Sequence, residues 1–254
     1  MVSPSNDLSQ RRLRPVGKER IIVALDVPSL TEARDVVQEI REEVGAFKVG
    51  LELLTAEGSR RVVEGLADLG CRVFYDGKFN DIPNTIAGAA RALSKLGVWM
   101  FDVHASSGLE SLRACSENRG PALAVAVTVL TSFSSGGAQD VFGSTIETKV
   151  LRLATMAARE QLDGVVCSAQ ELPILKGSVE TRDLLTVVPG IRPRWAETGD
   201  QRRVMTPGDA VRDGADYLVI GRPILKPPTS IPSRKAAAAM IRAEIEELDK
   251  GGAS

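Results

Sequence analysis

Eight short apolar segments recur along the chain, and most of them are followed by a stretch with helical periodicity. Each segment is continuous and rich in valine and isoleucine, as in strands that are covered on both faces. Strands that alternate with helices indicate a parallel sheet with crossover helices. The predicted strands are Ile21–Asp26, Ala46–Gly50, Arg72–Asp76, Val98–His104, Ala122–Thr128, Gly164–Ser168, Leu185–Gly190 and Asp216–Gly221.

Three of the intervening stretches carry apolar side chains at helical spacing, namely Ser29–Val44, Thr145–Leu162 and Arg234–Leu248. Eight strand–helix units in about 200 residues fit a closed barrel better than an open doubly wound sheet. No GxGxxG motif follows the first strand, which disfavours a dinucleotide-binding sheet. We therefore predict a single-domain (β/α)8 TIM barrel at residues 21–248, with a flexible arm at residues 1–20 and a tail at residues 249–254.

The charge balance and the cysteines exclude several classes of protein. With 32 basic and 33 acidic residues, the chain offers no electrostatic reason to bind nucleic acid or an anionic membrane. No stretch has the ~18 consecutive apolar residues of a membrane span, and the first twenty residues lack the apolar core of a secretory signal. Three widely spaced cysteines and a single histidine argue against a disulfide framework and a metal site. We expect a cytoplasmic protein without a bound metal.

Polar side chains stand at or just past the ends of several predicted strands. In (β/α)8 barrels the active site is built at these carboxyl ends. Each residue alone has a structural explanation, such as a helix cap or a lysine that reaches from a strand to solvent. Together, at one level of the barrel, they predict an active site formed by Asp26, Lys48, Asp76, Lys78, His104, Thr128 and Arg222.

The segment VFYDGKFNDIPNTI, from Val73 to Ile86, sets charged residues directly after an apolar run. Asp76 and Lys78 are two residues apart, so their side chains share a face of an extended strand. With Lys48 from the neighbouring strand and Asp81 after a turn, they form a Lys–Asp–Lys–Asp array that keeps each group charged. Such a lysine can protonate a carbanion, and such a carboxylate can oppose a substrate carboxylate. A solvated network of surface charges is the structural alternative.

The last two strands end in VVPGIRP and ADYLVIGRPI. The loops after strands seven and eight of a barrel frequently bind phosphate. Gly190 and Gly221 permit close approach of the backbone, and Arg222 offers a permanently charged guanidinium. The polar segment between the two strands, with Arg192 and Gln201, can fold over an anion as a lid.

DGKFNDIPNT resembles the DxKxxDIPNT signature of the orotidine 5'-phosphate decarboxylase family. The similarity continues in the family's order through ALDV, FKVGLEL, VHASSG, AVTVLTS, VVPGIRP, GDQRRVMTP and VIGRPI, and so covers nearly all of the chain from Ile21 to Ile224. The resemblance implies conversion of orotidine 5'-monophosphate to uridine 5'-monophosphate and CO2 in pyrimidine biosynthesis. It also implies that no metal or organic cofactor takes part.

The resemblance also assigns roles to individual residues. It implies that Lys78 donates a proton to C6 of the pyrimidine, that Asp76 faces the departing carboxylate, and that Lys48 completes the charged array. Asp81 and Thr85 match positions that the family supplies to the neighbouring subunit's site, which implies a homodimer. The implied substrate contacts are Asp26 and Lys48 at the ribose hydroxyls, Ile82 at the CO2 pocket, Thr131 at the base, and Arg192, Gln201, Gly221 and Arg222 at the phosphate.

Two departures from the family pattern and two alternative functions remain. Gly77 and Asn80 stand where the family more often has leucine and histidine, and we expect Gly77 to loosen the strand end.

One alternative is a metal-dependent sugar-phosphate decarboxylase or synthase on the same barrel. Such relatives carry a glutamate where this chain has Lys48, and a cation there would repel a metal ion. The other is a non-catalytic nucleotide-binding barrel, which the presence of all four charged residues disfavours.

Overall fold

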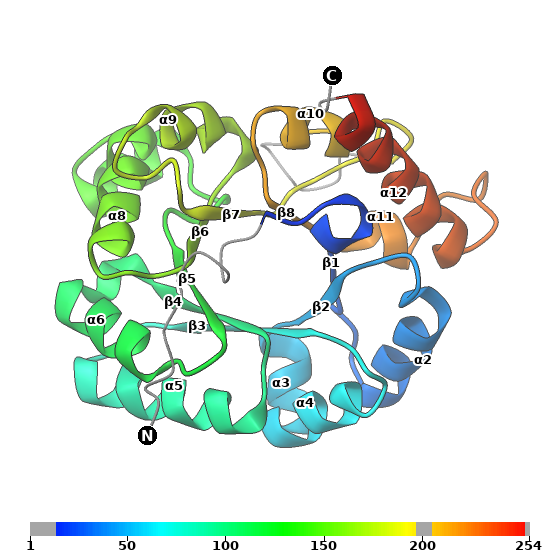
Figure 1. Cartoon of the computed structure of the whole chain (residues 1–254), viewed down its shortest axis with the longest axis horizontal. Coiled ribbons are helices and arrows are strands. Elements are labelled where there is room, and N and C mark those ends of the chain that lie inside the picture. The colour runs from blue at the N-terminus through cyan, green and yellow to red at the C-terminus, as the bar shows by residue number, and fades with distance from the viewer. Residues whose placement is uncertain (1–13, 197–204, 252–254) are drawn as a thin grey trace, which may run out of the picture.

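The structure is a computed structural model that describes residues 14–196 and 205–251. Eight parallel strands close into a barrel in sequence order, and β8 pairs back onto β1 (Figure 1). The predicted single-domain (β/α)8 barrel and all eight predicted strands are confirmed. The strands are β1 (Ile21–Ala24), β2 (Ala46–Val49), β3 (Val73–Phe79), β4 (Met100–His104), β5 (Leu123–Val127), β6 (Gly164–Val166), β7 (Leu185–Val188) and β8 (Tyr217–Ile220).

The α-helices form an outer ring around the strands (Figure 1). Ser29 caps α2 by accepting a hydrogen bond from the backbone N–H of Glu32 at 3.3 Å, and Thr145 caps α8 in the same way. In the described ranges the helices are η1 (Gly17–Arg20), α2 (Leu30–Ile40), α3 (Leu51–Glu57), α4 (Ser59–Ala67), α5 (Pro83–Leu96), η2 (Ala105–Ser107), α6 (Leu109–Asn118), α7 (Ser135–Phe142), α8 (Ile146–Arg159), η3 (Ala169–Glu171), α9 (Leu172–Gly177), α10 (Pro207–Arg212), α11 (Arg222–Leu225) and α12 (Arg234–Gly251).

Alternate residues of each strand enter two different apolar layers. Ile22 of β1 packs inside the barrel with Phe74 of β3 and Val187 of β7. Its neighbours Ile21 and Val23 belong instead to the layer between the strands and the helices. Because side chains alternate across a strand and both faces are covered, every position favours an apolar residue. This double burial explains why the strands read as continuous apolar runs in the sequence.

β3 is longer than predicted and irregular at its carboxyl end. Its pairing with β4 is regular at Tyr75, shifts, and resumes only at Phe79. Within the shift Lys78 has a φ of +52°, a left-handed conformation that costs a residue other than glycine about 1 kcal/mol or more. The backbone at Lys78 is therefore not extended as expected, although its side chain still meets that of Asp76 at the cavity.

Gly77 has a packing role at the irregular end of β3. A Cβ atom at this position would lie 2.6 Å from Cε1 of Tyr75, which is closer than such atoms approach. The missing side chain lets the rings of Tyr75 and Phe79 stack with centroids 5.8 Å apart. Glycine here fits the bend of β3 that brings Lys78 toward the barrel axis.

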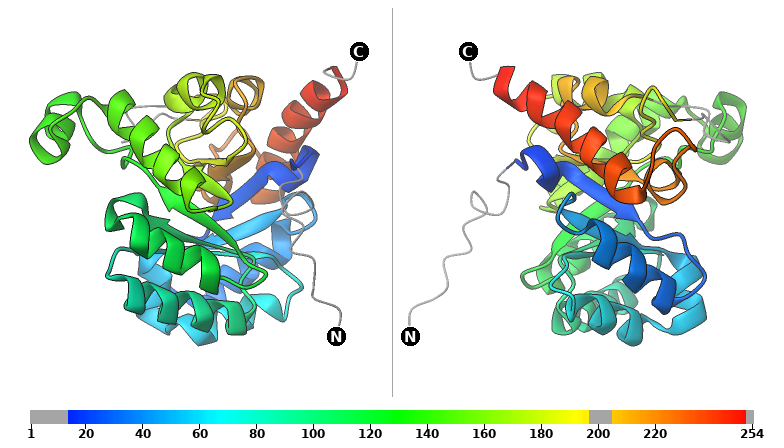
Figure 2. Two further views of the ribbon diagram at one scale, coloured as in Figure 1. Left: turned by 60° about the vertical axis from the view of Figure 1, so that its left-hand side comes forward. Right: turned by 90° about the vertical axis from the view of Figure 1, so that its right-hand side faces the viewer.

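The ends of the described chain lie against the barrel. In η1, the backbone N–H of Gly17 donates to Asp249 of α12 at 2.6 Å, and Arg20 forms an ion pair with Asp249 at 3.1 Å. The remaining residues of the predicted arm and tail, 1–13 and 252–254, lie outside the described residues. α7, which follows β5, extends outward from the barrel beyond α8 (Figure 2). None of the described helices is long and apolar enough to cross a membrane.

Candidate active site

A cavity of about 270 Å³ opens at the carboxyl ends of the strands. Its lining residues come from, or directly follow, β1, β2, β3, β5, β6, β7 and β8. A parallel barrel places all of these strand ends at one mouth, so side chains far apart in sequence meet there. This is the position at which the polar strand-end residues were expected to converge.

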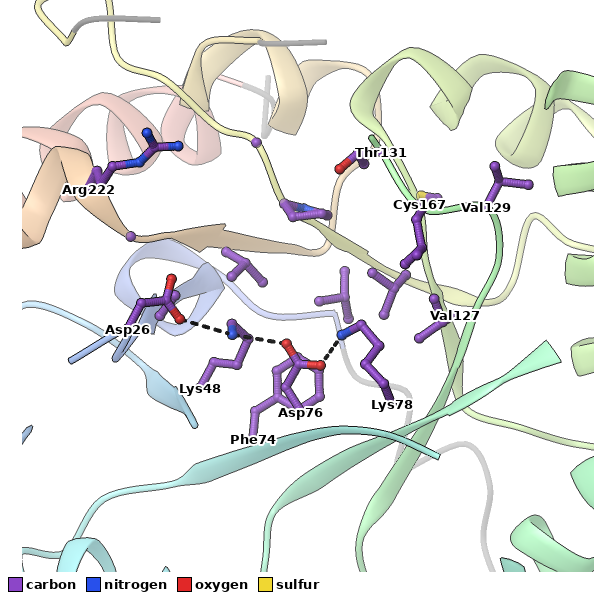
Figure 3. A pocket seen from close by; sticks show the side chains of 18 of the residues that line it. Asp26, Lys48, Phe74, Asp76, Lys78, Val127, Val129, Thr131, Cys167 and Arg222 are labelled. Atoms are coloured by element: carbon purple, nitrogen blue, oxygen red, sulfur yellow. Dashed lines mark hydrogen bonds and ion pairs between the residues drawn. The ribbon is translucent and has the colours of Figure 1, made fainter. Parts of the chain in front are cut away.

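Four charged side chains form a row across one wall of the cavity (Figure 3). Lys48 Nζ lies 2.9 Å from Oδ2 of Asp76 and 3.6 Å from Oδ1 of Asp26. The other carboxylate oxygen of Asp76, Oδ1, accepts a hydrogen bond from Nζ of Lys78. Asp76 therefore sits between two ammonium groups, and its side chain is only 13% exposed.

Opposite charges hold these groups in their ionised forms. Burial alone would raise the pKa of the Asp76 carboxyl, but Lys48, then Asp102 and Lys78, lower it well below its usual range. Burial would lower the pKa of the Lys78 ammonium, but the carboxylates of Asp102 and Asp76 outweigh burial and raise it. At neutral pH the cavity thus presents a carboxylate beside a protonated lysine.

Asp102 of β4 is the site residue that sequence reasoning missed. Its side chain is fully buried, and it accepts hydrogen bonds from the backbone N–H of Lys78 at 2.8 Å and from Lys78 Nζ at 3.0 Å. Burial and the neighbouring carboxylate of Asp76 raise the pKa of Asp102 to about 7. The available signal was a lone acid inside the apolar strand MFDVH, where an unpaired charge would be costly.

The wall of the cavity away from this row is largely apolar. Phe74 and Val219 approach from β3 and β8, while Val127, Val166 and Val187 come from β5 to β7. Cys167 also lines the cavity, and burial raises the pKa of its thiol, so this group stays protonated and unreactive. An apolar surface facing a row of charges suits a flat organic ring with one ionised substituent.

The loops after β7 and β8 contribute two arginines to the cavity. Arg192 is buried and donates to the carbonyl of Ile191 at 2.8 Å, whereas Arg222 is exposed at the rim (Figure 3). Gly190 has a φ of +80°, which favours glycine, and Gly221 and Thr131 also line this end. Permanently charged guanidinium groups next to open backbone form a suitable place for a phosphate. Gln201 lies outside the described residues.

Three residues implied by the resemblance lie on the exposed face beside the mouth. Asp81, Ile82 and Thr85 are all exposed, and within the described ranges none of them lines the cavity. The side chain of Asp81 accepts from the backbone N–H of Ile82 at 2.7 Å, and Ile82 is 66% exposed. These positions suit residues that serve a second subunit more than residues that serve their own cavity.

Two further strand-end residues, Thr128 and His104, are described by their contacts with the surrounding barrel. The hydroxyl of Thr128 donates to the carbonyl of Val166 at 2.8 Å and so links β5 to β6. His104 at the end of β4 is half-buried, and burial together with nearby Lys78 lowers the pKa of its imidazole. At neutral pH His104 is therefore uncharged.

Residues 19–239 match the family model described as "Orotidine 5'-phosphate decarboxylase / HUMPS family". This match covers most of the chain, including every strand of the barrel. The chain belongs to this family. The expectation of an enzyme of the orotidine 5'-phosphate decarboxylase family is confirmed.

Curated relatives and solved structures agree with the family assignment. The chain is 45% identical over 248 residues to orotidine 5'-phosphate decarboxylase of Moorella thermoacetica, covering 93% of this chain and 96% of the relative. It is 46% identical over 211 residues to that of Dichelobacter nodosus, with 81% and 91% covered. The crystal structure of orotidine 5'-phosphate decarboxylase from Lactobacillus acidophilus matches with a TM-score of 0.76 at 32% identity, covering 92% of this chain and 99% of that one.

Proposed function

We propose that the protein decarboxylates orotidine 5'-monophosphate to uridine 5'-monophosphate and CO2, with Lys78 as the proton donor. The observation that carries this proposal is the row of Lys48, Asp76 and Lys78 in a cavity whose other end bears Arg192 and Arg222. The names of the relatives supply the substrate. Membership of the family places the reaction in pyrimidine biosynthesis.

In the proposed reaction the bond between C6 of the pyrimidine and its carboxylate breaks. CO2 leaves, the electron pair stays on C6, and Lys78 Nζ transfers one proton to that carbon. The carboxylate of Asp76, held ionised between two lysines, opposes the substrate carboxylate in the ground state. The ammonium of Lys78 stabilises the negative charge that develops on C6, because it is fixed in place before the reaction begins.

The remaining residues bind the substrate away from the reacting carbon. Asp26 and Lys48 are assigned to the ribose hydroxyls, Thr131 to the base, and Ile82 to the space where CO2 forms. The phosphate contacts are assigned to Arg192, Gln201, Gly221 and Arg222. Binding energy from the phosphate end can offset the unfavourable approach of two carboxylates at the other end.

Lys48 also bears on the metal-dependent alternative. Its ammonium lies between Asp26 and Asp76 and satisfies the two carboxylates that a divalent cation would otherwise attract. The chemistry proposed here therefore uses side chains alone and needs no cofactor. A cytoplasmic location is part of the proposal and is supported by the three unpaired cysteines.

We further infer that two copies of the chain form a homodimer in which Asp81 and Thr85 complete the partner's site. Support comes from exposed apolar side chains at or just before the first turns of three helices. Leu51 of α3 is 59% exposed, Leu109 of α6 is 39% exposed, and Ile82, which is 66% exposed, directly precedes α5. Apolar residues grouped beside a cavity mouth fit a surface that another subunit covers.

The test follows the ultraviolet absorbance of orotidine 5'-monophosphate with purified protein, with and without a metal chelator. We expect turnover that resists the chelator and falls by at least about 1,000-fold in kcat in Lys78→Ala. Lys176→Ala is the matched control, since Lys176 also pairs with a buried aspartate, Asp216, at 3.0 Å but does not line the cavity. Folded, dimeric wild-type protein without turnover would contradict the proposal and favour the non-catalytic barrel.

A further inference from the structure

We infer that Asp102 is a positioning residue that holds Lys78 in the geometry needed to donate its proton. The inference rests on the proposed role of Lys78 as the donor. Asp102 is not itself among the residues that line the cavity. It acts through Lys78, because each of its two carboxylate oxygens accepts a hydrogen bond from that one residue.

The first contact fixes the backbone. Lys78 lies in the pairing shift between β3 and β4 and has a φ of +52°. In a regular ladder its N–H would donate to a carbonyl of the neighbouring strand. Here Oδ1 of Asp102 accepts that N–H at 2.8 Å in place of a backbone carbonyl. The carboxylate thereby compensates for the bend that turns Lys78 into the barrel mouth.

The second contact fixes the ammonium. Oδ2 of Asp102 lies 3.0 Å from Nζ of Lys78, and Asp76 accepts from the same nitrogen. An ammonium has three N–H bonds, so two carboxylates leave the third to point at a bound substrate. Asp102 is fully buried and cannot turn away to solvent. It therefore holds the Lys78 ammonium from the buried interior, while Lys78 itself lines the cavity.

The surroundings of Asp102 leave few other groups that could take over this function. On β3 it faces Asp76 and Lys78, and its own strand carries His104 two residues further on. The residue opposite it on β5 is the apolar Val125, and behind β4 lies the buried thiol of Cys115 on α6. Of the carboxylates among these groups, Asp76 also accepts from the Lys78 ammonium, but it is already shared with Lys48.

Two substitutions of Asp102 separate its contributions. In Asp102→Asn the amide oxygen can still accept one of the two hydrogen bonds from Lys78, whereas Asp102→Leu has similar size and accepts none. Asp163→Asn is the matched control. Asp163 is likewise fully buried, accepts a backbone N–H from Ala124 at 2.8 Å and pairs with Arg119 at 3.1 Å, but neither of these partners lines the cavity.

Kinetics with orotidine 5'-monophosphate give the first readout. We expect kcat to fall by about 100-fold in Asp102→Leu and by less than about tenfold in Asp102→Asn, with KM within about threefold of wild type in both. Asp163→Asn should keep the wild-type kcat. A kcat within about threefold of wild type in Asp102→Leu would overturn the inference.

A second readout does not depend on turnover. Acetylation of Lys78 by acetic anhydride, followed by mass spectrometry at a series of pH values, reports the titration of its amine. Because the Asp102 carboxylate raises the pKa of Lys78, Lys78 should become reactive at lower pH in Asp102→Leu than in Asp163→Asn. Identical titration in the two variants would overturn the inference. If wild-type protein shows no turnover, the proposed function fails, but this measurement still tests the contact.

Discussion

Asp76 and Asp102 share the ammonium of Lys78, and burial raises the pKa of both carboxyls, but their other charged neighbours differ. Asp76 also contacts Lys48, so its pKa is lowered. Asp102 is more deeply buried and is repelled by Asp76, so its pKa is raised to about 7. One carboxyl is therefore fixed as an anion while its neighbour changes protonation near neutral pH.

This difference predicts a pH-dependent effect of Asp102 on stability. A group whose pKa is raised on folding stabilises the protein below its unfolded pKa, near 4, and loses that contribution as pH rises through its folded value, near 7. Asp102→Asn has no ionisable group at this position, so it does not lose stability in this way as pH rises. The melting temperature of Asp102→Asn relative to wild type should therefore increase by about 3 °C or more between pH 5 and pH 8.

Thermal unfolding followed by circular dichroism at the two pH values measures this difference. Asp102→Leu should show the same trend, because it removes the same ionisable group. A difference in melting temperature that stays constant from pH 5 to pH 8 would mean that Asp102 does not titrate in this range.

The sequence was sufficient to find the charged residues that line the cavity, but not Asp102, the buried acid that contacts Lys78. Lys48, Asp76 and Lys78 stood out because charges follow apolar strands at positions where a barrel builds its active site. Asp102 is inside a strand, and its role depends on a pairing shift between β3 and β4. That shift lies where Gly77 packs against Tyr75, a tertiary contact that periodicity does not encode.

The strands themselves were predictable because each is buried on both faces, whereas their ends were not. β1, β6 and β7 end two residues before the predicted boundaries, because residues such as Asp26 and Gly190 leave the ladder to line the cavity. Strand ends depend on where tertiary contacts replace pairing. Apolar pattern alone therefore locates a strand to within a few residues.

Close packing between β6 and β7 predicts a large effect of one small substitution. A Cβ atom on Gly164 would lie 2.3 Å from the carbonyl oxygen of Leu185, and the backbone there is held by pairing on both sides. We expect Gly164→Ala to reduce the free energy of unfolding by about 2 kcal/mol or more, because the strands must separate. Urea denaturation measures this loss.

Gly88→Ala is the control for this substitution. Gly88 lies in the interior of α5, and a Cβ atom there would meet nothing within 4 Å. Alanine should instead increase the free energy of unfolding by about 0.5–1 kcal/mol, because it favours the helix. Equal effects of the two substitutions would contradict the packing argument.

One side of the barrel mouth exposes the residues that we propose serve a partner subunit. Asp81, Ile82 and Thr85 lie together at the start of α5, exposed beside the cavity that they do not line within the described residues. In an interface with twofold symmetry the same patch of both copies would meet, and each copy would reach the other's mouth. A dimer of this kind contains two sites, and each site combines residues of both subunits.

Mixing two inactive variants tests whether the sites are shared. In a mixed dimer of Lys78→Ala and Asp81→Asn, one site carries both substitutions and the other carries neither. Random exchange makes about half of all dimers mixed, so about a quarter of the wild-type activity should return. A mixture of Lys78→Ala with Asp76→Asn is the control and should stay inactive, because both residues serve their own subunit's site. Mixed dimers that form without regaining activity would show that Asp81 does not act across the interface.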